Sequence, residues 1–346
     1  MNIALLAPFE ERVPPRKYGG TERVVYTLAE ELHRLGHNVS VFASGDSHIS
    51  GRLIPIIPKA FGSSGTKRLR EAYTYRCLAK VVNYLQTETF DIIHNHIGWQ
   101  ALLFKELIKQ PMITTIHWVL DNSCERTMYD LYRHMPVVSI SKSQRKPLPR
   151  LHYAGTVYHG LDLREFSFNP KPDDYLAFLG RFSPVKGPLE AIEVAKRTGS
   201  RLVMAAKINE FEREFFETQV RPHIDGRQII FVGELGQKQK IRMLQRARAL
   251  LTPIKWEEPF GLTNIEAMAV GTPVIALRRG SMAEIIKDGQ TGMLCDTIDE
   301  MVQAVAKIDT IARQACRAHV EKHFTATRMA ERYLTLYARI ASAKRT

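Results

Sequence analysis

The chain has 346 residues, of which 45% are hydrophobic and 25% are charged, and its formal net charge is +13. This length predicts two domains of about 150 residues each, and the composition is that of a globular protein with a sizeable core. No apolar stretch approaches the roughly 20 residues that span a bilayer. The first residues, MNIALLAPFEERVPP, lack the basic start of a signal peptide. We therefore expect a cytoplasmic protein, and we leave open a peripheral association with the inner face of the membrane.

The positive charge admits three kinds of partner: nucleic acid, an anionic membrane surface or a phosphorylated ligand. The sequence has no RNP motif, zinc finger or basic heptad region, so we expect no nucleic-acid partner. Basic residues concentrate at 59–80 and 142–150. Each stretch is either a solvated face or a patch that binds lipid or a phosphate group of an acceptor.

Short apolar runs recur along the whole chain and are separated by amphipathic stretches. Because the runs do not alternate with polar residues, they predict strands buried on both faces of a parallel sheet. In the first half the predicted strands cover residues 3–7, 39–43, 91–95, 112–117, 137–140 and 156–158. In the second half they cover residues 175–179, 201–205, 228–232, 249–253, 273–276 and 292–295. The clearest predicted helices between them cover residues 21–35, 189–197 and 238–247.

A segment with two prolines and no helical periodicity, REFSFNPKPDD at 164–174, separates two series of strand–helix units. We therefore predict an α/β fold of two facing Rossmann-like domains with parallel sheets. The N-terminal domain covers 1–165 and the C-terminal domain 166–324. A final helix within 325–346 has no strand after it, and it can pack on either domain, including back on the N-terminal one.

The loop before the first predicted helix is the first candidate for phosphate binding. It contains Gly19 and Gly20 at a helix N-terminus, where backbone N–H groups can approach an anion. A plain turn before a helix has the same sequence features. The loop lacks the GxGxxG pattern, and no acidic residue closes the second strand, which argues against a nicotinamide-dependent dehydrogenase.

A second loop, GRFSPVKG at 180–187, follows the first strand of the C-terminal domain and leads into a helix. Its two cations suit a diphosphate, because Arg181 can hydrogen-bond two oxygens and Lys186 supplies a point charge. A solvated basic loop without a specific ligand is the alternative.

The third motif reads WEEPFGLTNIEAMA at 256–269, followed by GTPV. Glu258 lies in a loop ahead of a predicted helix, and Glu266 lies in the first turns of that helix. Between them, helix N-terminal amides can hold a phosphate, and each carboxylate can accept hydrogen bonds from sugar hydroxyls. A capping box formed by Thr263 and Glu266 competes with this interpretation for the same carboxylate.

Glu258 and Glu266 enclose seven residues, and this E-x7-E pattern within EPFGL…EAMAxGTPVIA resembles the retaining GT-B glycosyltransferases of family four, the glycosyltransferase group 1 type. The Gly-Gly loop, the VSIS stretch ending at Ser141, the Gly-Leu-Asp at 160–162 and GRFSPxKG occur in the order of that family. The resemblance therefore covers nearly the whole chain.

The resemblance implies a hexosyltransferase that uses a nucleotide-diphosphate sugar as donor and requires no cofactor. It implies an acceptor-binding N-terminal domain, a donor-binding C-terminal domain and closure of the two over the donor. It assigns a catalytic role, beside the reacting centre or the leaving diphosphate, to His117, Arg181, Lys186 and Glu258. It assigns donor binding to Gly19, Gly20, Val232, Gly233, Phe260, Gly261, Leu262, Thr263 and Glu266.

Two residues depart from the family pattern: His159 stands where asparagine is frequent, and Arg279 precedes Gly280 where a second glycine is common. Three other histidines suggest a metal site, because His94 and His96 could share a strand face and His117 ends the next predicted strand, although it is far off in sequence. They fall short of a full ligand set, and the chain has no convincing DxD motif, so we expect no metal.

These observations predict transfer of a sugar to an acceptor hydroxyl with retention of anomeric configuration. One alternative is a GT-B nucleotide-sugar epimerase, which would act on the donor without an acceptor. The other is a non-enzymatic basic protein that binds anions or lipid. The sequence leaves open the nucleotide (UDP, GDP or ADP), the sugar, the acceptor, which could be lipid-linked, and the oligomeric state.

Overall fold

The computed structural model describes residues 1–62, 66–120 and 123–342, and the chain divides into two compact units. The first unit joins Met1–Gly160 to Ala326–Thr346, and the second is Leu161–Thr325. The boundary therefore falls at Gly160, near the predicted segment at 164–174. The last four residues of the predicted C-terminal helix, 343–346, lie outside the described part.

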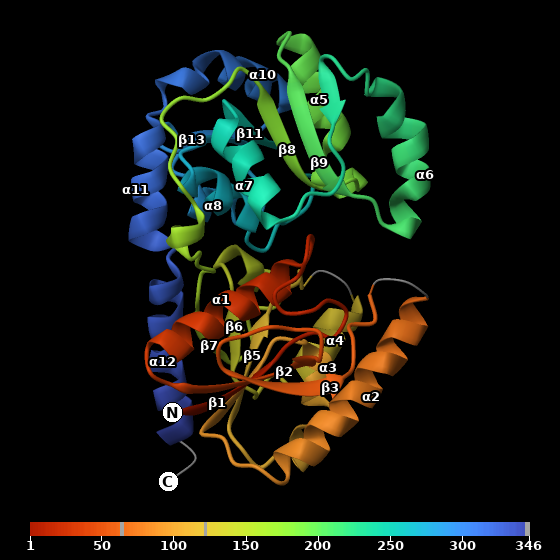
Figure 1. Ribbon diagram of the computed structural model, residues 1–346, viewed down its shortest axis with the longest axis vertical. Helices are drawn as coiled ribbons and strands as arrows, with labels where there is room; N and C mark the ends of the chain where they lie inside the picture. The colour runs from red at the N-terminus through yellow and green to blue at the C-terminus, as the bar shows by residue number, and fades with distance from the viewer. Residues whose placement is uncertain (63–65, 121–122, 343–346) are drawn as a thin grey trace. The chain divides into compact units, whose positions relative to one another are not determined.

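The first unit is built on a parallel sheet of seven strands in the order β3-β2-β1-β4-β5-β6-β7. Its strands are β1 (Asn2–Leu6), β2 (Asn38–Ser44), β3 (Arg52–Ile57), β4 (Ile92–Asn95), β5 (Met112–Ile116), β6 (Val137–Ser139) and β7 (Tyr153–Thr156). Its helices are α1 (Gly20–Arg34), α2 (Lys67–Leu85), α3 (Trp99–Leu102), α4 (Ser123–Leu131) and α12 (Ala326–Ser342). Figure 1 shows α1 and α12 close together, and α12 packs against β4 and β5.

The second unit is built on a parallel sheet of six strands in the order β10-β9-β8-β11-β12-β13. Its strands are β8 (Leu176–Arg181), β9 (Leu202–Lys207), β10 (Ile229–Phe231), β11 (Ala249–Thr252), β12 (Val274–Leu277) and β13 (Gly292–Cys295). Its helices are α5 (Pro188–Arg197), α6 (Arg213–Phe215), α7 (Gln237–Arg246), α8 (Leu262–Ala269), α9 (Met282–Ile285), α10 (Ile298–Lys307) and α11 (Arg313–His323).

Both sheets have the doubly wound order in which the first strand of the unit lies between the second and the fourth. The predicted α/β class and the two parallel sheets are thus confirmed. In such a sheet the order reverses beside the first strand, and ligands bind outside the carboxyl ends of the strands at that point. These points lie after β1 and β4 in the first unit, and after β8 and β11 in the second.

Two strand predictions in the first unit need correction. The edge strand β3 was not predicted, because its proline and its alternating pattern weaken the signal of a buried strand. Its residues Leu53, Ile54, Pro55 and Ile56 alternate in exposure. The strand predicted at 156–158 lies at Tyr153–Thr156, where Ser139 of β6 pairs with Thr156.

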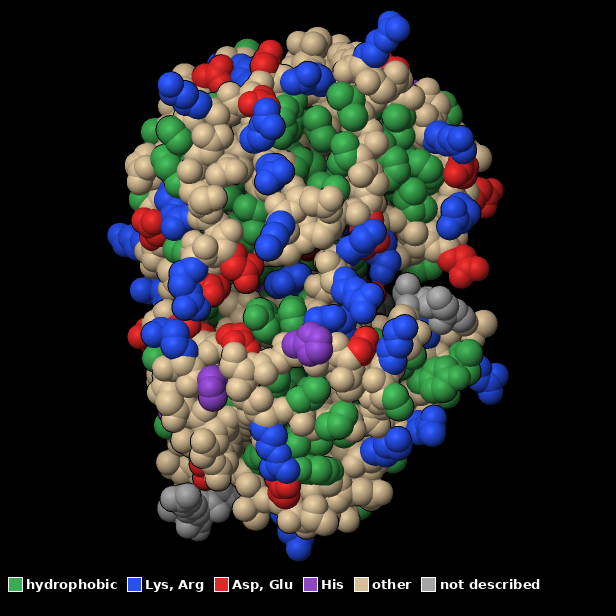
Figure 2. Space-filling model, viewed as in Figure 1, with side chains coloured by type: hydrophobic (Ala, Val, Ile, Leu, Met, Phe, Trp, Pro, Cys, Tyr) green, Lys and Arg blue, Asp and Glu red, His purple; other side chains and the backbone are tan. Residues whose placement is uncertain are grey.

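The charged residues lie mainly on the surface. On the face shown in Figure 2, Lys and Arg side chains are spread over both units, with Asp and Glu side chains between them. No helix in the described ranges is both long enough and apolar enough to cross a membrane.

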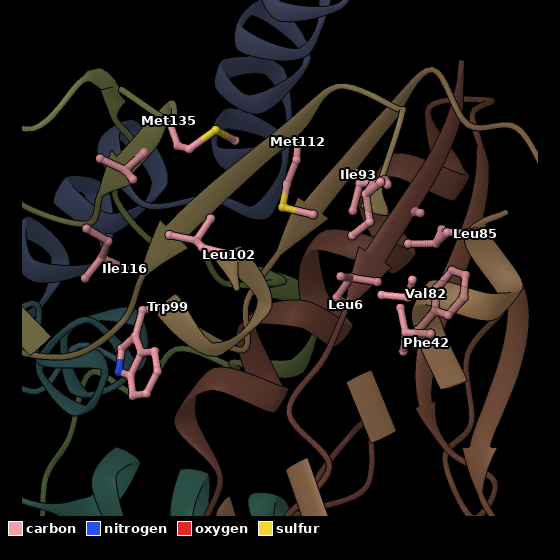
Figure 3. Packing of buried hydrophobic residues seen from close by; sticks show 14 of the residues in the cluster. Leu6, Phe42, Val82, Leu85, Ile93, Trp99, Leu102, Met112, Ile116 and Met135 are labelled. Carbon is pink, nitrogen blue, oxygen red and sulfur yellow. The ribbon is translucent and has the colours of Figure 1, made fainter. Parts of the chain in front are cut away.

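The core of the first unit lies between its sheet and the helices α2, α3 and α4. Leu6 and Phe42 on the strands lie beside Val82 of α2 (Figure 3), and Ile93 and Trp99 belong to the same buried cluster. Burial of each such side chain contributes about 1.5–3 kcal/mol. This packing fixes the strands whose carboxyl ends carry the histidines described below.

Candidate active site

Most of the residues predicted to bind the donor in the second unit lie where the sheet order reverses, in the loops after β8 and β11 and at the start of α8. Gly187 ends the first loop with φ of 72°, and a Cβ on it would lie 2.0 Å from the carbonyl oxygen of Pro253 in the second. Lys255 N also donates to Val185 O at 2.8 Å. The two loops therefore pack backbone to backbone, and a side chain at residue 187 would separate them.

Lys186 and Glu258, predicted from separate motifs, form an ion pair across these loops. Trp256 joins them, because its Nε1 donates to Glu258 Oε2 at 2.8 Å and its ring centroid lies 4.8 Å from Lys186 Nζ. The cation thus sits on the indole face and beside a carboxylate, both of which stabilise its charge. Trp256 begins the third motif, but its sequence context alone predicts no role for it.

Arg181 lies at the end of β8 and pairs with Glu212, with 3.3 Å between Nη1 and Oε1. Asn209 Nδ2 donates to the other Glu212 oxygen at 2.8 Å. The Nε atom of Arg181 is buried and has no hydrogen-bond partner among the described residues. An anion at this place would satisfy a donor that is otherwise costly to bury. Glu212 lies outside every sequence motif, so nothing in the sequence indicated that it would pair with Arg181.

Glu266 is nearly buried and pairs with Lys240 of α7, with 2.5 Å between Oε1 and Nζ. The capping-box alternative is wrong, because α8 begins at Leu262 with Gly261 as its N-cap and without a side-chain cap. Thr263 therefore lies inside the first turn. The backbone amides of residues 260–263 lie at this helix N-terminus, where an anion is favoured.

The turn at Arg279 and Gly280 packs against the backbone of the loop that carries Glu258. Gly280 has φ of 55°, and a Cβ on it would lie 2.3 Å from the Glu258 carbonyl oxygen. Gly280 N donates to Glu257 Oε2 at 3.0 Å, and Ser281 Oγ donates to Phe260 O at 2.8 Å. The departure at Arg279 thus lies next to a glycine that the packing requires.

The predicted base-binding residues Val232 and Gly233 follow β10 at the edge of the same sheet. Val232 is 42% exposed, and the carbonyl of Gly233 accepts from Ala206 N at 3.1 Å. In the first unit, Gly19 and Gly20 begin α1 after β1, as predicted. A Cβ on Gly19 would lie 2.6 Å from Pro15 and 3.1 Å from Glu22 Oε2, so a buried carboxylate lies beside this turn and opposes an anion there.

His117 follows β5 in the first unit and belongs to a row of four histidine rings with His94, His96 and His159. Its Nε2 lies 2.9 Å from His96 Nδ1, and burial lowers the pKa of His117 to about 3. His117 is therefore neutral at physiological pH. From the sequence, His159 was only a departure from a family pattern, and nothing predicted its contact with His117.

The histidines are arranged for hydrogen bonds with one another and with hydroxyls. Both ring nitrogens of His94 are engaged, Nδ1 with the Tyr337 hydroxyl at 2.6 Å and Nε2 with Thr115 Oγ1 at 2.7 Å. Within the ranges that the structure describes, no group of three or more His, Cys, Asp or Glu side chains could hold a metal ion.

Gln144 holds the loop that carries His117. Its Nε2 donates to the carbonyls of Ile116 and Trp118, both at 2.8 Å, and its Oε1 accepts from Ile140 N at 2.9 Å. The residues before and after His117 are thus fixed by one buried amide. Gln144 was not predicted from the sequence, because nothing near it in the chain indicates these partners.

Comparison with known proteins links the chain to one enzyme class. Residues 162–322 match the family described as glycosyl transferases group 1, and residues 18–165 match glycosyltransferase family 4. The phosphatidyl-myo-inositol mannosyltransferase of Mycolicibacterium smegmatis is 26% identical over 92% of this chain and 86% of its own length. The glycogen synthase of Mycobacterium tuberculosis is 27% identical over 59% of this chain and 56% of its own length.

Solved structures show the same fold. The sucrose-phosphate synthase of Thermosynechococcus elongatus has a TM-score of 0.81 at 21% identity, covering 99% of this chain and 100% of that one. Anabaena HepE in complex with UDP and glucose has a TM-score of 0.75 at 17% identity, covering 98% and 99% of the two chains. The fold is therefore GT-B.

Proposed function

Because the chain belongs to the group 1 glycosyltransferases, we propose that it transfers a hexose from a nucleotide-diphosphate donor to an acceptor hydroxyl with retention of configuration. One observation carries the proposal: Arg181, Lys186, Glu258 and Glu266 all lie at the end of β8, on the loops after β8 and β11, or on α8. These elements lie where the strand order of the second sheet reverses. Two cations, a helix N-terminus and two carboxylates are the groups that a diphosphate and two sets of sugar hydroxyls need.

The diphosphate is proposed to bind Arg181 and Lys186. Each cation is held by a carboxylate, Glu212 or Glu258, so both are already in place before a ligand arrives. As the bond from the anomeric carbon to the phosphate oxygen breaks, these cations stabilise the charge that develops on the leaving group. The new bond forms to the acceptor oxygen on the same face, and the acceptor proton passes to the leaving phosphate.

The two carboxylates are proposed to bind hydroxyls of different sugars. Glu258 would contact the transferred sugar and Glu266 the ribose, with the base along Val232 and Gly233. Glu266 is 3% exposed, so a hydroxyl bound to it would be shielded from water. A ligand that lacks this hydroxyl would therefore bind much more weakly. The seven residues between the two carboxylates, and their likeness to retaining enzymes, support retention. An inverted anomer in the product would contradict it.

The acceptor is proposed to be lipid-linked, with the enzyme bound peripherally at the membrane. One matching relative is a phosphatidyl-myo-inositol mannosyltransferase. In this chain, the exposed basic residues Arg68 and Arg76 of α2 lie near Leu69 and Tyr73 in the sequence, which are 46% and 41% exposed. Basic side chains with exposed apolar neighbours suit an anionic interface. The side chain of Lys67, in the same basic stretch, lies outside the described residues. Sedimentation with anionic vesicles, compared with the double variant Arg68→Glu/Arg76→Glu, tests this part; equal binding would contradict it.

Thermal-shift measurements with UDP, GDP, ADP and their sugar conjugates test the donor site. A ligand at a hundredfold excess over its Kd stabilises the folded state by about 2.7 kcal/mol. We expect one nucleotide to stabilise the wild type and not Glu266→Ala, while Glu193→Ala, a change on the exposed face of α5, leaves the shift intact. No stabilisation by any nucleotide would contradict the proposal and favour a basic binding protein. Conversion of the donor sugar without an acceptor would identify an epimerase.

A further inference from the structure

The four histidine rings of the first unit form a continuous row, in which His94, His96 and His159 are buried and His117 is partly buried. The ring centroids are 3.9 Å apart for His94 and His96, 5.2 Å for His96 and His117, and 5.3 Å for His117 and His159. His94, His96 and His159 are at most 3% exposed. His94 and His96 lie at alternate positions at the carboxyl end of β4, and His117 follows the neighbouring strand β5. The row therefore includes His117, to which the family resemblance assigns a place beside the reacting centre.

His94 anchors one end of the row. Its two ring nitrogens bond the Tyr337 hydroxyl and Thr115 Oγ1, and Thr115 Oγ1 in turn lies 2.8 Å from the Tyr333 hydroxyl. Both tyrosines are on α12 and fully buried. This network fixes the plane of His94, and the His96 ring lies 3.9 Å from it, so His96 has little freedom to rotate.

The next two rings share one hydrogen bond, between His96 Nδ1 and His117 Nε2. His96 Nε2 is buried and has no hydrogen-bond partner among the described residues. Likewise, no residue in the described part of the chain is found bonded to Nδ1 of His117, which is thus the one ring nitrogen of His117 left for a ligand.

Both rings are neutral, because burial lowers the pKa of His96 well below its usual value and that of His117 to about 3. Between two neutral rings, one nitrogen donates and the other accepts. If His117 donated, His96 would carry its own proton on Nε2, as a buried N–H without an acceptor. If His96 donates, its Nε2 carries no proton and is a buried acceptor without a partner. Buried donors without partners are rarer in proteins than buried acceptors without partners, so the second arrangement is favoured.

We propose that His96 is a positioning residue whose Nδ1–H donates to Nε2 of His117, so that His117 carries its proton on Nδ1 and presents a neutral N–H donor to the ligand. The catalytic consequence rests on the proposed function. His117 then donates a hydrogen bond to an oxygen of the donor sugar and cannot accept the proton of the acceptor hydroxyl. That proton therefore goes to the leaving phosphate. His159, stacked on His117 at an interplanar angle of 18°, keeps the ring in this plane.

Nitrogen-15 NMR of protein labelled only at its histidines tests the proton positions, since the shift separates protonated from bare ring nitrogens. We expect the wild type to show His117 with its proton on Nδ1. The variant His96→Asp offers only an acceptor to His117, so it should move that proton to Nε2. A wild type with the proton on Nε2, or the same His117 tautomer in wild type and His96→Asp, would overturn the proposal.

Kinetics supply the second readout. We expect His96→Leu to lower kcat by about tenfold to a hundredfold with a smaller change in KM for the donor. His96→Asn, whose amide can donate to His117, should recover much of that loss. Equal kcat in His96→Leu and wild type would overturn the role. Near-ultraviolet circular dichroism checks folding, and if His96→Leu fails to fold, the wild-type spectrum and His96→Asn still decide. The NMR result holds without any transferase activity, so it separates failure of this inference from failure of the proposed function.

Discussion

Lys240 Nζ lies 2.5 Å from Glu266 Oε1, and the two side chains are only 17% and 4% exposed. The pair joins α7 to α8, and it holds the proposed ribose-binding carboxylate in one position before any nucleotide is bound. A carboxylate that loses its cation at such a place keeps the cost of burial without the compensating attraction. Lys240 therefore supports a carboxylate of the proposed donor site, although no motif contains it.

We predict that Lys240→Met destabilises the second unit by about 3–5 kcal/mol and weakens nucleotide binding. Urea denaturation measures the first effect, and nucleotide titration at a temperature where the variant is folded measures the second. Lys240→Arg keeps the charge and should lose much less of both. A Lys240→Met variant that binds nucleotide as tightly as the wild type would show that Glu266 does not depend on this partner.

Lys186 gives a second prediction, because its cation contacts Glu258 and lies over the Trp256 ring. Lys186→Met should lower kcat by about a hundredfold or more, the usual effect of removing one group that stabilises a leaving oxyanion. Lys255→Met is the matched control, since Lys255 lies in the same pair of loops but pairs with Glu190 and is 45% exposed. Steady-state kinetics with varied donor concentration measures both variants. An equal loss of kcat in the two would contradict the role of Lys186 at the leaving group.

The sequence predicted the two sheets because buried parallel strands appear as continuous apolar runs. Arg181, Lys186 and Glu258 were expected in loops between a strand and a helix, and Glu266 in the first turns of a helix. The structure has them there, with Arg181 as the last residue of β8. Their roles stay a prediction. The sequence did not predict β3, where Pro55 interrupts an exposed edge strand. A search for continuous apolar runs does not detect an edge strand whose residues alternate between buried and exposed.

The partners of the site residues could not be predicted in the same way. Lys240 with Glu266, and Arg181 with Glu212, meet only after whole helices pack, and neither Lys240 nor Glu212 has a local signal. The histidine row shows the same limit. The shared face of His94 and His96 followed from strand geometry, whereas the stacking of His159 depends on where β7 ends.

The buried histidines also predict how stability changes with pH. Burial lowers the pKa of His94, His96 and His159 well below 6.5 and that of His117 to about 3. Between these values and about pH 6.5 the unfolded chain binds protons that the folded chain does not, so the free energy of unfolding falls as pH falls. Each such histidine contributes a slope of about 1.4 kcal/mol per pH unit. Tyr333 and Tyr337, which pack on His94, titrate far above this window because burial raises their pKa.

Urea denaturation at about pH 8 and about pH 5 measures this dependence. We expect His159→Asn to lose less free energy of unfolding between the two pH values than the wild type, by the contribution of one histidine. Carboxylates that titrate in the same range cancel in this difference. Identical losses in the two proteins would mean that His159 is not neutral in the folded state.

The turn behind Glu258 gives the last prediction. A Cβ at Gly280 would lie 2.3 Å from the carbonyl oxygen and 2.4 Å from the amide nitrogen of Glu258, so Gly280→Ala must move the backbone of that residue. Gly289→Ala is a close control, because Gly289 has a similar positive φ of 71° but open space around its Cβ. Each change costs about 1–2 kcal/mol for the left-handed backbone. We expect only Gly280→Ala to lower kcat with the donor as well, since it alone displaces Glu258 relative to Lys186. Equal kinetics in the two variants would show that the position of Glu258 does not limit the reaction.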